Sequence, residues 1–319
     1  MKKLIAIVAG EPNSINSEII AKAWKKIRHK ENYFIIGNYS IIKKQIIHNS
    51  LKINLLKITS LNEIMNKKFL NILNVPLKFK SIFASNFIES QKYVLKSLDI
   101  AHNLAFTGKI KSFINAPINK KNFDNKYLGV TEYLAAKNRL QDKEVMLIYN
   151  KKLAVVPLTT HLEIKKVTNK INGNLIQKKI IILNNTYLKL FKKKPKIAIL
   201  GLNPHNSENR KNSIENKIII PAIKKLKNLG VNIKGPFPAD TIFNIKKKLD
   251  CNVIVGMYHD QVLAPFKALY GYDAVNITLG LKYLRLSPDH GTAQDIMGKN
   301  KANPQSLISA INFLNKIND

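Results

Sequence analysis

Short runs rich in isoleucine and valine recur along the chain and alternate with longer segments whose apolar residues have helical spacing. The predicted strands are Leu4–Ala9, Tyr33–Ile36, Ser112–Asn115, Val145–Tyr149, Ala154–Pro157, Lys196–Leu200 and Asn252–Gly256. The predicted helices include Ser17–Arg28, Ile88–Thr107, Ile164–Leu190 and Asn212–Leu229. Strands that alternate with helices form a mainly parallel sheet covered by helices on both faces. The sequence therefore predicts an α/β protein.

The length of the chain and its cysteine content restrict the class of protein further. The 319 residues suffice for two α/β domains or one large one. The single cysteine, Cys251, excludes an internal disulfide and a cysteine-rich zinc site, and it fits a reducing compartment. The first apolar run ends at Gly10 without a cleavage-like pattern, and no stretch approaches the roughly 18 apolar residues of a membrane span. We expect a cytoplasmic protein.

The chain is strongly basic, with a formal net charge of +33. Only four of its 53 basic residues are arginines, whereas proteins that read nucleic acids favour arginine for its bidentate geometry. The lysines are scattered rather than clustered. We therefore expect attraction of anionic small molecules and no nucleic-acid or membrane partner. A non-catalytic, basic nucleic-acid-binding protein remains an alternative.

Three of the seven histidines, His161, His205 and His259, lie within a few residues of the end of a predicted buried strand. Ligands of open α/β sheets collect at the carboxyl ends of strands. Three neutral imidazoles that converge on one cation would form an open metal site. Each histidine could instead cap a loop, and gaps of 44 and 54 residues do not prove convergence. Asp260 would orient the His259 ring or be solvated.

A second set of polar residues, Lys267, Asn276 and Arg285, recurs at intervals of nine on alternating strand-like and loop segments. A lysine, an amide and a guanidinium together suit a carboxylate or a phosphate. Arg285 is the more informative member because arginine is rare in this chain. A surface position is the alternative for Lys267.

A turn rich in small residues follows, from Ser287 to Ala293, and a further run extends to Pro304. Such a turn, opening into a helix, lets backbone amides approach an adenosine or phosphate group. An ordinary loop with a helix cap is the alternative. The chain has neither a P-loop nor a Gly-x-Gly-x-x-Gly motif after a strand, so a dinucleotide would bind by another route.

Several segments together resemble the 4-hydroxythreonine-4-phosphate dehydrogenase family of vitamin B6 biosynthesis. The matching segments are Thr159–Leu162, Gly201–His205, Gly235–Pro236, Pro238–Thr241, Met257–Gln261, Val275–Leu281 and Ser287–Pro304. The last of these is shared with the wider isocitrate and isopropylmalate dehydrogenase superfamily. The motifs occur in the family's order over nearly the whole chain.

The resemblance implies two α/β/α domains with the active site in the cleft between them. One domain would comprise residues 1–125 and 275–319 and bind the nucleotide. The other, residues 126–274, would carry the metal and substrate site and the dimer interface. The resemblance also implies a homodimer with shared active sites, in which His259 comes from the neighbouring subunit.

The resemblance further implies the ligand sets. His161, His205 and His259 would bind one divalent metal ion, which could be zinc, cobalt, magnesium or manganese. The substrate would contact Thr131, Asp240, Lys267, Asn276 and Arg285. The cofactor, NAD with NADP as the alternative, would contact Asp289, His290, Gly291, Thr292, Asp295 and Asn303. Lys267 is a candidate general base if its pKa is depressed, although an electrostatic role would serve equally.

The chain departs from the family pattern at two places. Val130 stands where the family has a substrate-binding histidine, beside the retained Thr131. Ser14 and Asn16 replace glycines of the amino-terminal turn. Because asparagine tolerates positive φ and serine can cap a helix, we expect the turn to survive.

The resemblance implies NAD-dependent oxidation of 4-hydroxythreonine 4-phosphate to a β-keto acid, which loses carbon dioxide to give 3-amino-2-oxopropyl phosphate in pyridoxal phosphate biosynthesis. The substitution at Val130 keeps open a sister dehydrogenase of phosphorylated threonate or erythronate.

Overall fold

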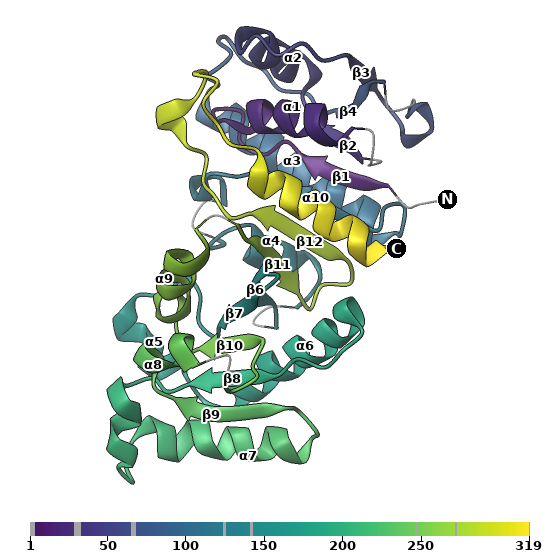
Figure 1. The fold of residues 1–319 in the computed structure, drawn as a ribbon. Helices are drawn as coiled ribbons and strands as arrows, with labels where there is room; N and C mark the ends of the chain where they lie inside the picture. The colour runs from purple at the N-terminus through teal and green to yellow at the C-terminus, as the bar shows by residue number, and fades with distance from the viewer. Residues whose placement is uncertain are drawn as a thin grey trace. The chain divides into compact units, whose positions relative to one another are not determined.

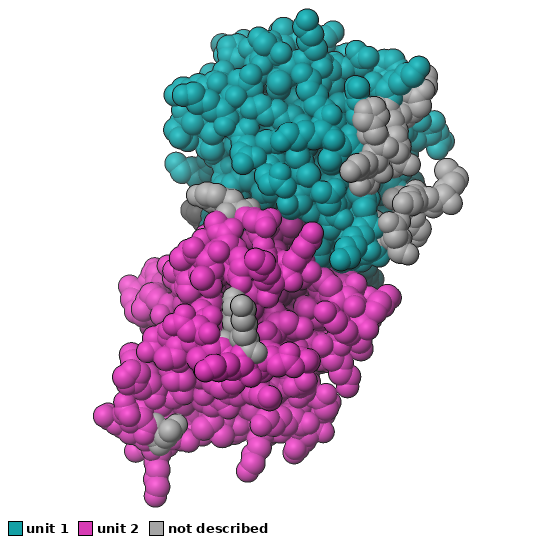
Figure 2. Space-filling view, viewed as in Figure 1, with its two compact units in different colours: residues 1–134, 282–319 teal, residues 135–281 magenta. Residues whose placement is uncertain are grey.

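The computed structural model describes residues 4–28, 33–64, 68–123, 126–140, 143–245, 248–271 and 273–318. The chain divides into two compact units, which Figure 2 shows in different colours. Unit 1 comprises residues 1–134 and 282–319, and unit 2 comprises residues 135–281. The predicted assignment of nucleotide and metal binding to separate domains, divided after residues 125 and 274, stays a prediction.

Unit 1 is built on a parallel sheet whose strands lie in the order β3-β4-β2-β1-β5-β12. The strands are β1 (Ile5–Val8), β2 (Tyr33–Gly37), β3 (Leu55–Ile58), β4 (Leu70–Asn74), β5 (Ser112–Asn115) and β12 (Leu284–Pro288). The helices are α1 (Asn16–Ile27), α2 (Tyr39–His48), α3 (Phe87–Phe106), α4 (Val130–Lys137) and α10 (Gln305–Asn318), of which α4 runs across the boundary of the unit. Short 3₁₀ turns cover Leu61–Glu63, Lys120–Phe123 and Gln294–Ile296.

Helix α10, at the carboxyl end of the chain, lies beside α1 at its amino end (Figure 1). It also packs against β12 and β5, whereas α3 packs against β1, β2 and β5. Every residue of β1 and β2 is buried, as expected for strands of a parallel sheet covered by helices.

Unit 2 has a mixed sheet in the order β11-β6-β7-β10-β8-β9. The strands are β6 (Val145–Asn150), β7 (Leu153–Pro157), β8 (Ile197–Leu200), β9 (Ile233–Phe237), β10 (Val253–Gly256) and β11 (Val275–Leu279). The pairs β11–β6 and β6–β7 are antiparallel, and the pairs from β7 to β9 are parallel. The helices are α5 (Ile164–Lys170), α6 (Gly173–Phe191), α7 (Ile220–Asn228), α8 (Ala239–Ile245) and α9 (His259–Tyr270), with a 3₁₀ segment at Pro204–Asn209 and a π-helical turn at Glu215–Ile219.

The predicted α/β class with a mainly parallel sheet is confirmed, and each strand predicted from the sequence is present. The prediction of one helix over Ile164–Leu190 is wrong. The chain is extended at Asn172, whose side chain accepts a hydrogen bond from Leu175 N (2.9 Å) and starts α6. The predicted helix at Asn212–Leu229 becomes regular only at Ile220, next to Pro221, which has no backbone N–H.

A hydrophobic core fixes α8 and α9 against the strands of unit 2. It includes Leu153 and Val155 of β7, Ile254 of β10, and Val262 and Phe266 of α9. Among the described residues, no helix is both long enough and apolar enough to cross a lipid bilayer.

Candidate functional site

Four neighbouring parallel strands of unit 2 each end next to a predicted site residue. The strands lie in the order β7-β10-β8-β9. His161 follows β7, His259 follows β10, His205 follows β8 and Asp240 follows β9, each within five residues of the strand end. The carboxyl ends of parallel neighbours lie at one edge of a sheet. The topology therefore brings these four residues, which are far apart in the sequence, to the same edge.

His161 and His259 are direct neighbours at this edge. Their ring centroids are 5.8 Å apart and both residues are half-buried. The Asp260 carboxylate accepts a hydrogen bond from His259 Nδ1 (2.6 Å), which leaves Nε2 of that ring as the nitrogen available to a ligand.

His205 lies on a loop with an unusual backbone. Residues 205–208 all have positive φ, between 49° and 55°. The His205 side chain is exposed, with Nδ1 3.2 Å from Glu208 Oε1 and Nε2 4.0 Å from Asp240 Oδ2. Left-handed backbone costs a residue other than glycine about 1–2 kcal/mol. This conformation therefore has to be held by its surroundings.

The side chain of Glu215 supports this loop. Glu215 was not among the site residues predicted from the sequence. It is fully buried, and its carboxylate accepts hydrogen bonds from Leu202 N (3.0 Å), Asn203 N (2.9 Å) and Ser207 Oγ (3.0 Å). Burial acts to raise the pKa of Glu215, but the hydrogen bonds from Asn203 and Ser207 outweigh it and lower the pKa. The only hint of this role in the sequence is that Glu215 is an acidic residue within a segment of isoleucine, asparagine and lysine.

The donor set fits a divalent cation, because imidazole nitrogen suits zinc and other divalent transition metals. Within the described part of the single chain, however, no group of three histidine, cysteine, aspartate or glutamate side chains is close enough together to hold an ion. The structure thus pairs His161 with His259 and brings His205 near Asp240. It does not gather all three histidines around one point.

Two further predicted substrate residues lie in unit 2. Lys267 is exposed on helix α9. The prediction from its spacing, a strand-like or loop segment, is therefore wrong. The single chain also does not provide the burial that a general base would need. Asn276 is half-buried in β11, opposite Ile148 of β6. Its Oδ1 is buried and has no hydrogen-bond partner among the described residues. Such an atom is suited to accept a hydrogen bond from a ligand.

Arg285 lies on β12 in unit 1 and is 3% exposed. Its Nε donates to Asn115 Oδ1 (2.6 Å) and its Nη1 donates to Thr131 Oγ1 (3.2 Å). Burial lowers the pKa of Arg285 to about 10, against the opposing effects of Glu132 and Tyr283. The structure brings Arg285 into contact with Thr131, a second residue that is predicted to bind the substrate. Asn115 is a further residue of this site that was not predicted. The hint in the sequence was its position as a polar residue at the end of a predicted buried strand.

The predicted cofactor residues extend from the end of β12 to the start of α10. Asp289, His290 and Thr292 are half-buried, whereas Gly291, Asp295 and Asn303 are exposed. Apart from its two chain neighbours, no described residue lies within 4 Å of the position that a Cβ at Gly291 would take, so its backbone is open to a ligand. Asn303 Oδ1 accepts a hydrogen bond from Gln305 N (2.9 Å) at the start of α10. The exposed backbone fits a dinucleotide phosphate or ribose.

The amino-terminal turn tolerates Ser14 and Asn16 in a way that differs from the expectation. Neither residue has positive φ, and the N-cap of α1 is Ile15, without a side-chain hydrogen bond. Instead, Ser14 Oγ accepts from Asn16 N (3.1 Å). Asn16 Nδ2 donates to Ala9 O (2.9 Å) and Pro117 O (2.8 Å), which links the ends of β1 and β5.

Known proteins match the chain over most of its length. The family model described as "Pyridoxal phosphate biosynthetic protein PdxA" matches residues 29–314. The chain is 38% identical over 315 residues to a 4-hydroxythreonine-4-phosphate dehydrogenase of Sulfurihydrogenibium sp. (strain YO3AOP1), with 96% of each chain covered. It is 31% identical over 321 residues to the D-threonate 4-phosphate dehydrogenase of Pectobacterium atrosepticum, with 98% of each chain covered.

Solved structures agree with this result. The crystal structure of 4-hydroxythreonine-4-phosphate dehydrogenase from Klebsiella pneumoniae has a TM-score of 0.87 at 29% identity and covers 99% of this chain and 100% of its own. An isocitrate dehydrogenase from Methylococcus capsulatus, 11% identical, has a TM-score of 0.51 with 99% and 86% covered, and shares the fold alone. The predicted resemblance is confirmed, and the chain belongs to the PdxA family of dehydrogenases.

Proposed function

We propose that the chain is a divalent-metal-dependent, NAD-linked dehydrogenase of 4-hydroxythreonine 4-phosphate. The reaction oxidises the secondary alcohol to a ketone, with the hydride passing to NAD and a proton released. The resulting β-keto acid loses carbon dioxide to give 3-amino-2-oxopropyl phosphate. The observation that carries this proposal is that His161, His205 and His259 each follow one of three neighbouring parallel strands of one sheet, in a PdxA-family chain.

The three histidines would hold the cation through imidazole nitrogens, with Asp260 fixing the His259 ring. A bound divalent cation supplies Lewis-acid polarisation of the substrate hydroxyl, and NAD supplies the hydride acceptor. Asp240, which lies near His205, is suited to orient it or to accept a hydrogen bond from the substrate. As the resemblance implies, we propose a homodimer in which His259 of each site comes from the second copy.

Arg285 and Thr131 would bind an anionic group of the substrate. Because Asn115 and Thr131 hold the guanidinium, little side-chain entropy is left to lose on binding. Asn276 Oδ1 is an acceptor for a hydroxyl or ammonium group of the substrate. An electrostatic role for Lys267 fits its exposed position better than a role as general base.

A sister activity on threonate 4-phosphate or erythronate 4-phosphate is the second candidate. It is favoured by Val130, which is half-buried in the first turn of α4 beside Thr131. Valine cannot hydrogen-bond the substrate as the expected histidine would. Among the relatives, one is named 4-hydroxythreonine-4-phosphate dehydrogenase and another is named D-threonate 4-phosphate dehydrogenase.

The test is NADH formation at 340 nm with each of the three phosphorylated substrates, before and after chelation and metal reconstitution. We expect the highest kcat/KM with 4-hydroxythreonine 4-phosphate and a loss of turnover on chelation. A higher kcat/KM with threonate 4-phosphate would establish the sister activity instead. Salt-sensitive RNA binding with no NAD-linked turnover would establish the nucleic-acid alternative.

A further inference from the structure

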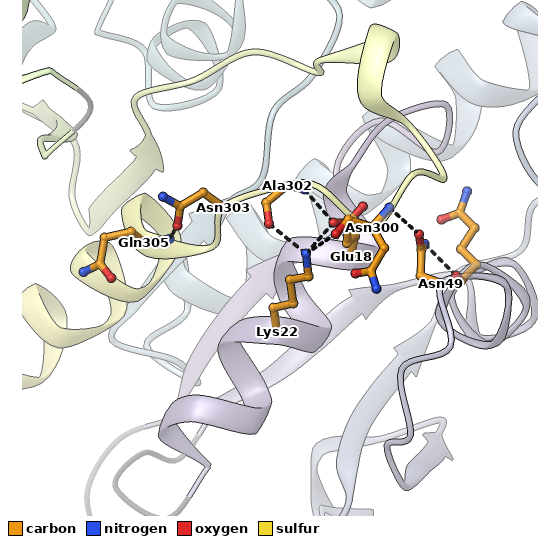
Figure 3. Close-up of polar contacts among 8 residues, drawn as sticks. Glu18, Lys22, Asn49, Asn300, Ala302, Asn303 and Gln305 are labelled. Carbon is orange, nitrogen blue, oxygen red and sulfur yellow. Dashed lines mark hydrogen bonds and ion pairs between the residues drawn. The ribbon is translucent and has the colours of Figure 1, made fainter.

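Side chains of α1 and of Asn49, the residue that follows α2, hold the backbone of the segment that leads into Asn303 (Figure 3). Glu18 Oε1 accepts a hydrogen bond from Ala302 N (2.7 Å). Lys22 Nζ donates to Asn300 O (2.9 Å) and Ala302 O (3.0 Å), and Asn49 Oδ1 accepts from Asn300 N (3.2 Å). Both backbone polar groups of Asn300 and both of Ala302 are therefore bonded to side chains. Side chains that are distant in the sequence thus fix the backbone of this segment.

Glu18 and Lys22 also contact each other, with Lys22 Nζ 2.7 Å from Glu18 Oε1. Glu18 is 2% exposed, so its carboxylate depends on this cation and on Ala302 N for compensation. The lysine ammonium has three hydrogens, and three protein oxygens accept from it. Lys22 therefore has no hydrogen left for a cofactor phosphate, and any influence on the cofactor has to pass through the loop.

An ordinary structural role explains only part of this arrangement. An acidic residue in the first turn of a helix interacts favourably with the helix dipole, and a Glu–Lys pair four residues apart adds a few tenths of a kcal/mol. Neither effect requires contact with residues 300 and 302, which are nearly 280 positions away in the sequence. The contacts are specific to the segment that we assign to the cofactor.

We propose that Glu18 and Lys22 are positioning residues for the dinucleotide. They fix the backbone of residues 300–302 and thereby set the place of Asn303, which follows directly. The proposal rests on the proposed function, because it takes the segment from Asp289 to Asn303 as the NAD-binding segment. It adds two residues that touch neither cofactor nor substrate and yet determine cofactor affinity.

The test is NADH binding by the Lys22→Met variant, which keeps the aliphatic stem and removes the ammonium group. The matched control is Lys26→Met, one turn further along α1, where the lysine is exposed. Binding is followed by energy transfer from Trp24, the single tryptophan of the chain, which is buried on the same helix. The KM for NAD, the KM for the phosphorylated substrate and the affinity for Co²⁺ are measured in parallel.

We expect Lys22→Met to raise the Kd for NADH and the KM for NAD at least about tenfold, or about 1.4 kcal/mol. Substrate KM and Co²⁺ affinity should stay within about twofold of the wild type, as should every value for Lys26→Met. Glu18→Gln, which keeps an acceptor for Ala302 N, should cause a smaller loss of NADH affinity. It replaces Lys22→Met if that variant fails to fold.

An unchanged NADH affinity in a folded Lys22→Met variant would overturn the proposal. An equal loss of NADH, substrate and Co²⁺ binding would also overturn it, since that pattern indicates general damage to the fold. If the wild type binds no NADH, the proposed function itself fails. Hydrogen exchange at the Asn300 and Ala302 amides then reports separately whether Lys22 orders the loop.

Discussion

The loop that carries His205 allows one prediction to be worked out from the structure. Four consecutive left-handed residues cost about 4–8 kcal/mol together, at about 1–2 kcal/mol each. The buried Glu215 carboxylate accepts hydrogen bonds from Leu202 N, Asn203 N and Ser207 Oγ, the three shortest of those it receives from this loop. At about 1.5–3 kcal/mol for each bond to a charged group, these contribute a comparable amount. Glu215 is therefore the residue on which the loop conformation depends.

Glu215→Gln removes the charge and replaces one accepting oxygen with a donor amide. We expect the free energy of unfolding to fall by about 2–4 kcal/mol, because the hydrogen bonds of residue 215 are no longer charge-assisted. We also expect Co²⁺ affinity to fall about 10–100-fold, the usual consequence of removing support from a metal ligand. Urea unfolding and titration of the Co²⁺ absorption measure the two effects.

The pH dependence gives an independent check of the same prediction. The pKa of Glu215 is lower in the folded chain than its ordinary value of 4.5. Its contribution to stability is therefore fully present above about pH 4.5 and is lost as the pH falls through the lower folded pKa. Glu215→Gln should lose this part of the acid sensitivity.

The matched control is Glu89→Gln in the first turn of α3 in unit 1, which should change stability and Co²⁺ affinity little. An unchanged urea midpoint and Co²⁺ affinity in Glu215→Gln would refute the reasoning about this loop.

Three further predictions concern the other sites. Arg285→Lys should raise the substrate KM at least about tenfold and lower the free energy of unfolding by about 1–3 kcal/mol, because lysine cannot reproduce the buried hydrogen bonds of the guanidinium; an unchanged KM would count against the anion site. Asn16→Ala should lower the urea midpoint by an amount equivalent to about 1–3 kcal/mol, because its link between β1 and β5 is lost; an unchanged midpoint would show that the link is dispensable. The third experiment mixes inactive His205→Ala and His259→Ala chains, which are dissociated and allowed to reassociate. If each site takes His259 from the partner, the mixture should regain about a quarter of wild-type activity. No recovery in verified mixed dimers would place all three ligands in one chain.

Much of the fold could be predicted from the sequence because buried parallel strands are continuous apolar runs. The missed strands are those without such a run. Strand β9 contains Gly235 and Pro236 and lies last in the order of unit 2, where a missing N–H is tolerated. Strand β3 is largely half-exposed and carries Lys57. Local composition at such strands does not distinguish them from loops.

The candidate site could be predicted only in part. Position after a buried strand made the three histidines candidates, but only the strand order makes β7, β10 and β8 neighbours. The order depends on long-range packing, which spacing along the chain does not encode. Glu215 and Asn115 escaped notice because their roles consist of contacts with backbone and side chains remote in the sequence.

The central claim is that His161, His205 and His259 hold one divalent cation. Anomalous diffraction from crystals of the metal-loaded protein, collected at the absorption edge of the bound metal, tests it most directly. We predict one ion per chain, with a nitrogen of each of the three histidines within about 2.0–2.3 Å of it. An ion bound by other residues, or full activity in crystals and solution shown to be free of divalent metal, would contradict the claim.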